Sequence, residues 1–172
     1  MAFSKRIRIL ASLVEPNKNI VDIGCDHALL DIYLTLYNHN SCIATDINEK
    51  AIQHAKENIK KYNLEIPVYV SDGLKNIPLL ENTTGIIAGM GTNTIIQILQ
   101  NQDLNQLSSF VIQTNNDYYL LRKFMTSIGY QIEEEITFYD KGIRYIAIKF
   151  IKGIQNYSYF ELLLGPKLMQ KK

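Results

Sequence analysis

The sequence predicts an α/β fold in which a mostly parallel seven-stranded sheet carries helices on both faces and ends in an antiparallel hairpin. Short apolar runs alternate along the chain with stretches that repeat every 3.6 residues, as strands alternate with helices. The early runs lack polar alternation, which is typical of parallel strands buried on both faces. The last two runs flank the three-residue turn Asp140-Lys-Gly142, so they are expected to pair antiparallel.

Residues 3–14 predict the first helix, because their apolar side chains share one side of a helical wheel. Arg6 falls inside this apolar arc. Two explanations are open: the stem of Arg6 covers apolar surface while its head reaches water, or the guanidinium contacts a substrate phosphate.

The remaining elements follow in regular alternation. Asn48 or Asp46 is expected to cap the third helix, and Gly129 to end the fifth. The predicted strands are 19–23, 42–46, 66–71, 84–88, 108–113, 131–138 and 143–150, and the further helices are 28–38, 48–62, 92–101 and 117–128.

Length and composition indicate one globular domain, 1–172, with 47% hydrophobic and 20% charged residues. No apolar run approaches the roughly 20 residues that span a bilayer, and no signal-peptide block follows the amino terminus. We therefore expect a cytoplasmic monomer without membrane contact. Cys25 and Cys42 form no metal-binding spacing, so no metal is expected. Because the net charge is only +1, a nucleic acid would need a local basic patch.

The turn after the first strand is the first candidate ligand site, since open α/β sheets bind ligands beyond the carboxyl ends of their strands. It reads Asp22-Ile-Gly-Cys-Asp-His27, with Gly24 as its single glycine. A dinucleotide fingerprint would need further glycines. The carboxylate of Asp26 would repel a pyrophosphate but suits a cationic amino group, such as that of S-adenosylmethionine. We expect Asp22, Gly24, Asp26 and His27 to bind this methyl donor.

Three further strand ends complete the predicted donor site. Asp46, with Ile47 beside it, is expected to accept hydrogen bonds from the ribose hydroxyls, although it also fits a helix cap. Asp72 is expected to accept the adenine amino group while Gly73 bends over the ring, unless the two form an ordinary turn. The loop Ala88-Gly89-Met90-Gly91 is expected to border the methyl group.

These segments resemble the bacterial tRNA (adenine-22 N1)-methyltransferases over nearly the whole chain. The motifs that carry the resemblance are Lys5-Arg-Ile-Arg-Ile-Leu10, Asp22-Ile-Gly-Cys-Asp-His-Ala28, Ile87-Ala-Gly-Met-Gly91, Ile112-Gln-Thr-Asn115 and Leu164-Gly-Pro166. The resemblance implies a Rossmann-like class I methyltransferase fold, S-adenosylmethionine as cofactor and tRNA as partner. It implies methylation of N1 of adenine 22 in the D arm.

The chain departs from the family pattern at several positions. Thr92 stands where the family has a further glycine, Thr114 where it has proline, and Leu29 and Asp31 where it often has tyrosine and proline. The family continues after Gly-Pro into a helical coiled-coil arm. Residues 151–172 are therefore expected to begin an extension that is missing or truncated here, and residues 1–18 to form a basic amino-terminal helix.

Asp26 is the first catalytic candidate implied by the resemblance, as a carboxylate that faces the adenine N6 amino group. Asn115 is the second, as an amide that holds the adenine edge. His27 either contacts the ligand or Asp26, or only structures the loop. Tyr118, with Tyr119, either stacks on the flipped base or packs within the protein.

Lys5, Arg6 and Arg8, helped by Arg122, are expected to contact the tRNA phosphates. Three competing functions stay open. The first is a class I methyltransferase acting on another RNA, a small molecule or a protein, and the second is a non-catalytic RNA-binding relative. The third, a nicotinamide-dependent oxidoreductase, is disfavoured by the missing glycines.

Overall fold

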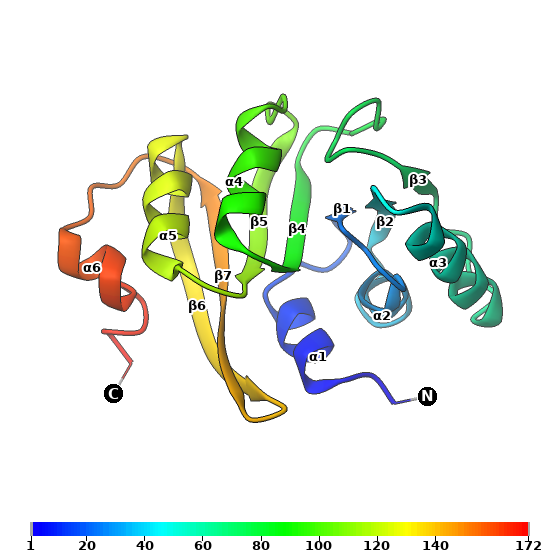
Figure 1. The fold of residues 1–172 in the computed structure, drawn as a ribbon, viewed down its shortest axis with the longest axis horizontal. Coiled ribbons are helices and arrows are strands. Elements are labelled where there is room, and N and C mark those ends of the chain that lie inside the picture. Colours follow the sequence, from blue (N-terminus) through cyan, green and yellow to red (C-terminus); the bar gives the residue numbers. More distant parts are fainter. Residues whose placement is uncertain (1, 172) are drawn as a thin grey trace.

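A computed structural model describes residues 2–171 and contains the predicted seven-stranded sheet, with strand order β3-β2-β1-β4-β5-β7-β6 (Figure 1). All strands run parallel except β7, which pairs antiparallel with both β5 and β6. The strands are β1 (Asn19–Ile23), β2 (Ser41–Asp46), β3 (Val68–Val70), β4 (Thr83–Met90), β5 (Leu107–Thr114), β6 (Tyr130–Asp140) and β7 (Ile143–Lys152). The helices are α1 (Lys5–Ser12), α2 (Leu29–Tyr37), α3 (Glu49–Lys61), α4 (Thr92–Gln100), α5 (Tyr118–Ser127) and α6 (Tyr159–Leu164). The predicted fold class is confirmed.

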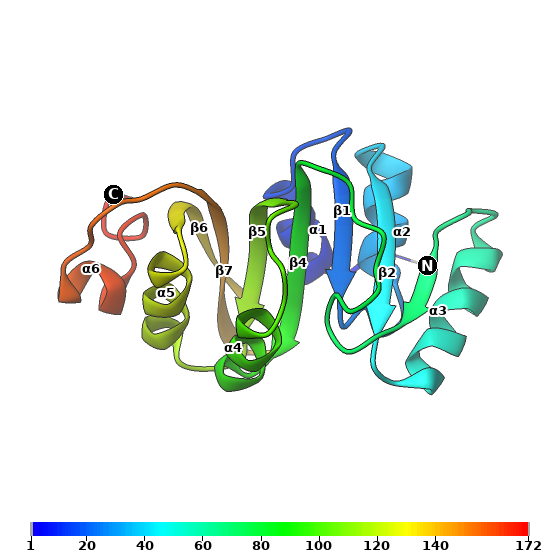
Figure 2. The same cartoon turned by 90° about the horizontal axis from the view of Figure 1, so that it is seen from above.

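The helices form a layer on each face of the sheet (Figure 2). Helices α1, α2 and α3 share one apolar cluster with the sheet, and α4, α5 and the carboxyl-terminal segment share the other. The apolar stripe predicted for residues 3–14 faces the first cluster through Leu10 and Ala11, which are buried. None of the helices between residues 2 and 171 combines the length and apolar character that crossing a bilayer requires.

Side-chain caps fix where several helices begin. Ser4 accepts a hydrogen bond from the backbone of Ile7, and Asp117 accepts one from Leu120. Of the two predicted caps for α3, Asn48 is the one observed, because its side chain accepts from the backbone N–H groups of Lys50 and Ala51. Asp46 is thereby left for another role.

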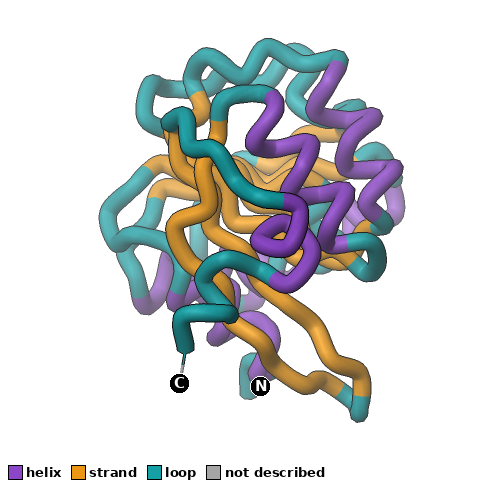
Figure 3. The backbone as a smooth tube through the Cα atoms, turned by 90° about the vertical axis from the view of Figure 1, so that its left-hand side faces the viewer, coloured by secondary structure: helices purple, strands orange, loops and turns teal. Residues whose placement is uncertain are grey.

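Two features of the closing hairpin differ from the prediction. Its turn has two residues, Lys141 and Gly142, rather than three, and both have positive φ, as the tight turns that match strand twist require. Its strands are longer than predicted, and the tip projects on the side where α1 lies (Figures 1 and 3). The hairpin therefore contributes to the wall of the site described below.

The carboxyl-terminal segment is held by a buried ion pair that the sequence did not reveal. Arg122 of α5 donates from Nε to Glu135 of β6 at 2.7 Å, and both side chains are inaccessible to solvent. Arg122 also donates to the carbonyls of Leu162 and Leu163, while Glu135 accepts from the backbone of Lys167. The phosphate contact predicted for Arg122 is therefore wrong for this structure, because its guanidinium is buried at 1% exposure and engaged.

The same ion pair explains the glycine of the Leu164-Gly-Pro166 motif. Gly165 has a φ of +96° at the end of α6, and a Cβ atom there would crowd the carboxylate of Glu135 and the guanidinium of Arg122. The helix α6, which was not predicted, is short and begins with a capping box between Ser158 and Glu161. The ion pair and the glycine together fold residues 159–168 against α5.

We predict that Arg122→Ala lowers the free energy of unfolding by about 3–5 kcal/mol, because it leaves the carboxylate of Glu135 buried without its partner. Urea denaturation measures this change. The matched control is Lys123→Ala, an exposed neighbour on the same helix, expected to change stability by about 0.5 kcal/mol or less. Equal stability of the two variants would show that the pair does not hold the fold.

Candidate functional site

Two adjoining cavities lie beyond the carboxyl ends of β1, β2 and β4. The first, of about 620 Å³, is bounded by α1, the loop after β1, the end of β4 and the tip of the β6–β7 hairpin. The second, of about 570 Å³, lies between the loops after β2 and β3 and the face of α4. Gly24, Asp46 and Met90 line both. The site falls where the chain order in the sheet reverses, between β1 and β4, as expected for an open α/β sheet.

The loop after β1 is held tightly against the neighbouring strand. The backbone N–H groups of Gly24 and Cys25 both donate to the carbonyl of Thr45, each at 2.8 Å. Gly24 has a φ of +80°, and a Cβ atom there would overlap the terminal methyl of Met90. The positive φ favours glycine at this position, and the short distance shows that the end of the Met90 side chain packs directly on the loop.

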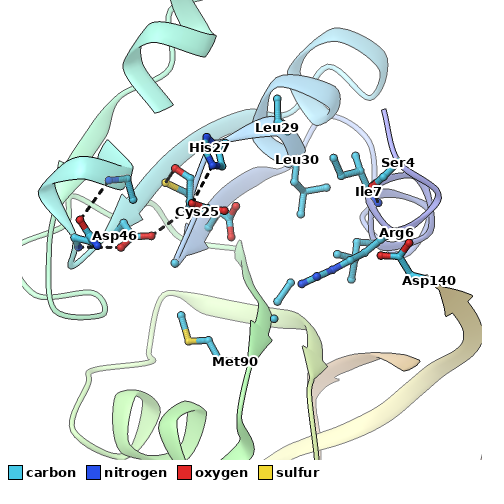
Figure 4. A pocket seen from close by; sticks show the side chains of 18 of the residues that line it. Ser4, Arg6, Ile7, Cys25, His27, Leu29, Leu30, Asp46, Met90 and Asp140 are labelled. Carbon is cyan, nitrogen blue, oxygen red and sulfur yellow. Dashed lines mark hydrogen bonds and ion pairs between the residues drawn. The ribbon is translucent and has the colours of Figure 1, made fainter. Parts of the chain in front are cut away.

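Asp46 lies where the two cavities meet, and both of its carboxylate oxygens accept backbone hydrogen bonds (Figure 4). One oxygen accepts from Asp26 at 3.1 Å and the other from Asn48 at 2.9 Å. The carboxylate thus joins the loop after β1 to the start of α3. Its orientation is fixed, with remaining lone pairs at the junction of the cavities.

Asp22 lies at the end of β1 and lines the first cavity, although only 4% of its surface is exposed. Burial raises the pKa of Asp22 to about 6, a contact with Asp31 lowers it, the charge of Asp46 raises it, and that of Arg6 lowers it. The neighbouring thiol of Cys25 is buried, and its pKa is raised by burial and then by Asp22 and other carboxylates, so it stays protonated. The wall therefore presents an acid rather than a nucleophilic sulfur.

Arg6 points from α1 into the first cavity (Figure 4). Its guanidinium lies so close to Gly89 that a Cβ atom there would overlap it. The head of Arg6 therefore faces the cavity, and the predicted phosphate contact stays a prediction. Lys5 and Arg8 of the same helix are exposed outside the cavity.

Asp26 and His27 form the exposed edge of the first cavity. Their side chains lie 3.5 Å apart, from Oδ1 of Asp26 to Nε2 of His27, and are 74% and 50% exposed. The carbonyl of His27 accepts a hydrogen bond from Asn58 of α3, which fixes the loop from a second side. Both side chains are therefore free to meet a substrate at the mouth of the cavity.

Asn115 lies beside the first cavity without lining it. Its side-chain amide donates to the carbonyl of Gly89 at 2.9 Å, and its backbone N–H donates to that of Met90 at 2.8 Å. Asn115 therefore supports the loop after β4, and its exposed side chain reaches the same edge of the sheet as Asp26. Gly91, also predicted to bind the donor, is the N-cap of α4 and lines neither cavity.

Tyr118 matches the packing alternative. Its hydroxyl donates to the carbonyl of Thr114 and accepts from the backbone of Ile146, and its ring lies next to the guanidinium of Arg122. Tyr119 packs against Tyr159, with ring centroids 5.4 Å apart.

The second cavity brings Ile47, Asp72 and Gly73 together, as predicted. Gln102, just after α4, closes this region, since it donates to the carbonyl of Asp72 and accepts from the backbone of Leu74. The sequence gave no signal for Gln102, because its role depends on α4 returning to the loop after β3. Asp140 and Lys141 at the rim of the first cavity were missed for the same reason: the hairpin tip reaches α1 only in three dimensions.

Comparison with known proteins agrees with this architecture. Residues 3–148 match the family described as methyltransferase domain. A putative tRNA methyltransferase of Mycoplasma genitalium is 34% identical over 98% of this chain and 79% of its own length. The tRNA (adenine(22)-N(1))-methyltransferase of Bacillus subtilis is 28% identical over 100% of this chain and 77% of its own length.

A solved structure of Streptococcus pneumoniae Sp1610, a putative tRNA (m1A22) methyltransferase in complex with S-adenosyl-L-methionine, superposes with a TM-score of 0.89. The two sequences are 29% identical over 98% of this chain and 82% of that one. The family match, the identities and the superposition all extend over most of the chain. The chain belongs to the methyltransferase-domain family and, within it, to the bacterial tRNA (adenine-22 N1)-methyltransferases.

Proposed function

We propose that this chain transfers a methyl group from S-adenosylmethionine to N1 of adenine 22 in the D arm of tRNA. The proposal rests on the pair of cavities joined at Gly24 and Asp46. Asp22 lines the first cavity, and the Asp72-Gly73 loop lines the second, where a flat ring fits. Each has a volume within the range of about 300–1,000 Å³ that is typical of small-molecule sites. The identity of the substrate, adenine 22 of tRNA, is inferred from the relatives named above.

The residues present suit the donor. The second cavity takes the adenine between Ile47 and the Asp72-Gly73 loop. Asp46, at the junction, accepts from the ribose hydroxyls with the lone pairs that its backbone contacts leave free. Asp22 and Arg6 line the first cavity with opposite charges, which matches the ammonium and carboxylate of an amino acid group.

S-adenosylmethionine supplies, when bound, a methyl group on a positively charged sulfur. The protein has to hold the target base in line with it, since N1 of adenine is a neutral nucleophile and needs no strong base. Alignment of this kind can contribute about 7–11 kcal/mol. Asp26, at the mouth of the first cavity, accepts from the N6 amino group and stabilises the positive charge that develops on the base. Asn115 holds the adenine edge, and His27 orients Asp26.

The tRNA approaches over α1 and the hairpin tip. Lys5 and Arg8 are exposed on α1, the helix that forms one wall of the first cavity, and Lys141 of the hairpin tip lines the same cavity. These cations contact phosphates, which gives affinity without reading sequence. Because N1 is hidden inside the duplex, adenine 22 has to leave the base stack to reach Asp26. We expect the protein to act in the cytoplasm, where its tRNA substrate is found.

A methylation assay on an unmodified tRNA transcript tests the substrate. We predict that a transcript with adenine at position 22 gains N1-methyladenosine, measured by mass spectrometry of its nucleosides. A matched transcript with guanine at position 22 is predicted to gain no methyl group. Equal methylation of both transcripts, or a product other than N1-methyladenosine, contradicts the proposal.

The role of Asp26 predicts that Asp26→Asn lowers kcat on tRNA by about 100-fold, because the charge that stabilises the transition state is lost. The Kd of S-adenosylhomocysteine, measured by calorimetry, should change far less. Asp103→Asn, at an exposed carboxylate in the loop after α4, is the matched control and should alter neither quantity. If kcat and the affinity for S-adenosylhomocysteine fall by the same factor, Asp26 acts only in the donor site.

A further inference from the structure

Thr92 and Thr114 form a buried pair of hydroxyl groups that the proposed mechanism does not use. Thr92 is the first residue of α4, Thr114 is the last residue of β5, and their Oγ1 atoms lie 2.8 Å apart. Only 1% of the surface of Thr92 and 0% of that of Thr114 is exposed. Both are positions at which the chain departs from the family pattern. Because buried hydroxyl groups destabilise a fold unless they are hydrogen-bonded, the pair indicates a defined network.

The hydroxyl group of Thr92 contacts the residues on both sides of Asn115. On one side it pairs with the hydroxyl group of Thr114, which directly precedes Asn115. On the other side it donates to the backbone carbonyl of Asn116 at 2.6 Å, a short and well-formed hydrogen bond. One buried hydroxyl group therefore ties together the two chain neighbours of Asn115.

Further hydrogen bonds connect the same two segments. The N-cap of α4 is Gly91, which has no side chain to accept from the first N–H groups of the helix. The side chain of Asn116 takes this role, because its Oδ1 accepts from the backbone N–H of Thr92 at 2.9 Å. The backbone N–H of Asn115 donates to the carbonyl of Met90 at 2.8 Å. The start of α4 and the end of β5 are thus fixed to each other around Asn115.

This anchorage determines which group of the Asn115 side chain meets a substrate. Its Nδ2 donates one hydrogen to the carbonyl of Gly89 at 2.9 Å. Its Oδ1 accepts from Nε2 of the buried Gln113 at 3.4 Å. The amide is therefore oriented with its oxygen toward Gln113, and the second Nδ2 hydrogen remains for a substrate. A shift of the backbone at Asn115 would move this donor away from the first cavity, which Gly89 lines.

We propose that Thr92 is a positioning residue for the target base: its buried hydroxyl group holds the Asn115 amide at the edge of the first cavity. The proposal rests on the proposed function, because it needs the target adenine at that edge. Thr92 lines neither cavity, so loss of its hydroxyl group affects catalysis through Asn115 and leaves the donor site intact. A displacement of about 1 Å in a positioning group can lower a rate about 100-fold.

The test compares Thr92→Val, which keeps the side-chain shape without the hydroxyl group, with Thr92→Ser, which keeps the hydroxyl group. Thr92→Val is expected to lower kcat on the transcript with adenine at position 22 by about 10- to 100-fold. The Kd of S-adenosylhomocysteine, measured by calorimetry, is expected to change by less than about twofold. Thr92→Ser is expected to retain most of kcat. In an Asn115→Ala background, Thr92→Val is expected to cause no further loss of kcat.

A matched control lies between the same two strands. Thr84 and Ser109 form another buried hydroxyl pair, 2.7 Å apart, near the beginning of β4 and β5 and thus far from the site. Thr84→Val is expected to lower the free energy of unfolding, measured by urea denaturation, without lowering kcat. Thr114→Val removes the partner hydroxyl group and replaces Thr92→Val in the comparison if that variant does not fold.

Three outcomes overturn the inference. The first is a kcat of Thr92→Val that is unchanged, or that falls no more than the kcat of Thr84→Val. The second is an equal loss of kcat and of affinity for S-adenosylhomocysteine, which would assign the effect to the donor site. The third is a further loss when Thr92→Val is added to Asn115→Ala. Failure of the unaltered chain to methylate the transcript would contradict the proposed function itself, so the two failures are distinguishable.

Discussion

The loop after β1 is fastened to the end of β2, and the geometry of the site depends on this attachment. Thr45 accepts two backbone hydrogen bonds from the loop and donates its hydroxyl to the carbonyl of Asp22. Asp46 accepts a third bond, from Asp26. These contacts hold Asp26 and Ala28 at positive φ, a conformation that costs residues other than glycine about 1–3 kcal/mol each. Such strain persists where the surrounding structure imposes it, which is common around ligands.

The rest of the site is built outward from that loop. With Gly24 fixed against Met90, the loop after β4 closes on the loop after β1, and Asn115 fastens it from β5. Helix α1 and the hairpin tip then add the far wall, including Arg6. The carboxyl-terminal segment takes no part in this wall. Its anchor on Arg122 and Glu135 stabilises the opposite side of the domain.

Local patterns in the sequence predicted the order and type of the elements because short apolar strands and amphipathic helices have different periods. They also placed Asp22, Gly24, Asp46 and Gly73 at strand ends, which meet at one edge in any parallel sheet. Contacts between distant segments were not predictable in this way. Arg122 reads as one more surface cation until β6 brings Glu135 beside it.

The same limit applies to the hairpin and to Arg6. A turn at residues 140–142 is visible in the sequence, but its approach to α1 depends on the length and twist of two strands that were predicted too short. The apolar arc of the first helix showed that Arg6 was unusual without showing where it points. Both answers came from packing at the first cavity, where α1 and the hairpin face each other.

We expect one donor molecule to span both cavities across Gly24 and Asp46, and a crystal structure with S-adenosylhomocysteine measures this. The adenine is expected between Ile47 and Asp72, the ribose hydroxyls on Asp46, and the ammonium against Asp22. A ligand confined to one cavity, or bound with its adenine beside Arg6, would show that the two cavities do not form one donor site.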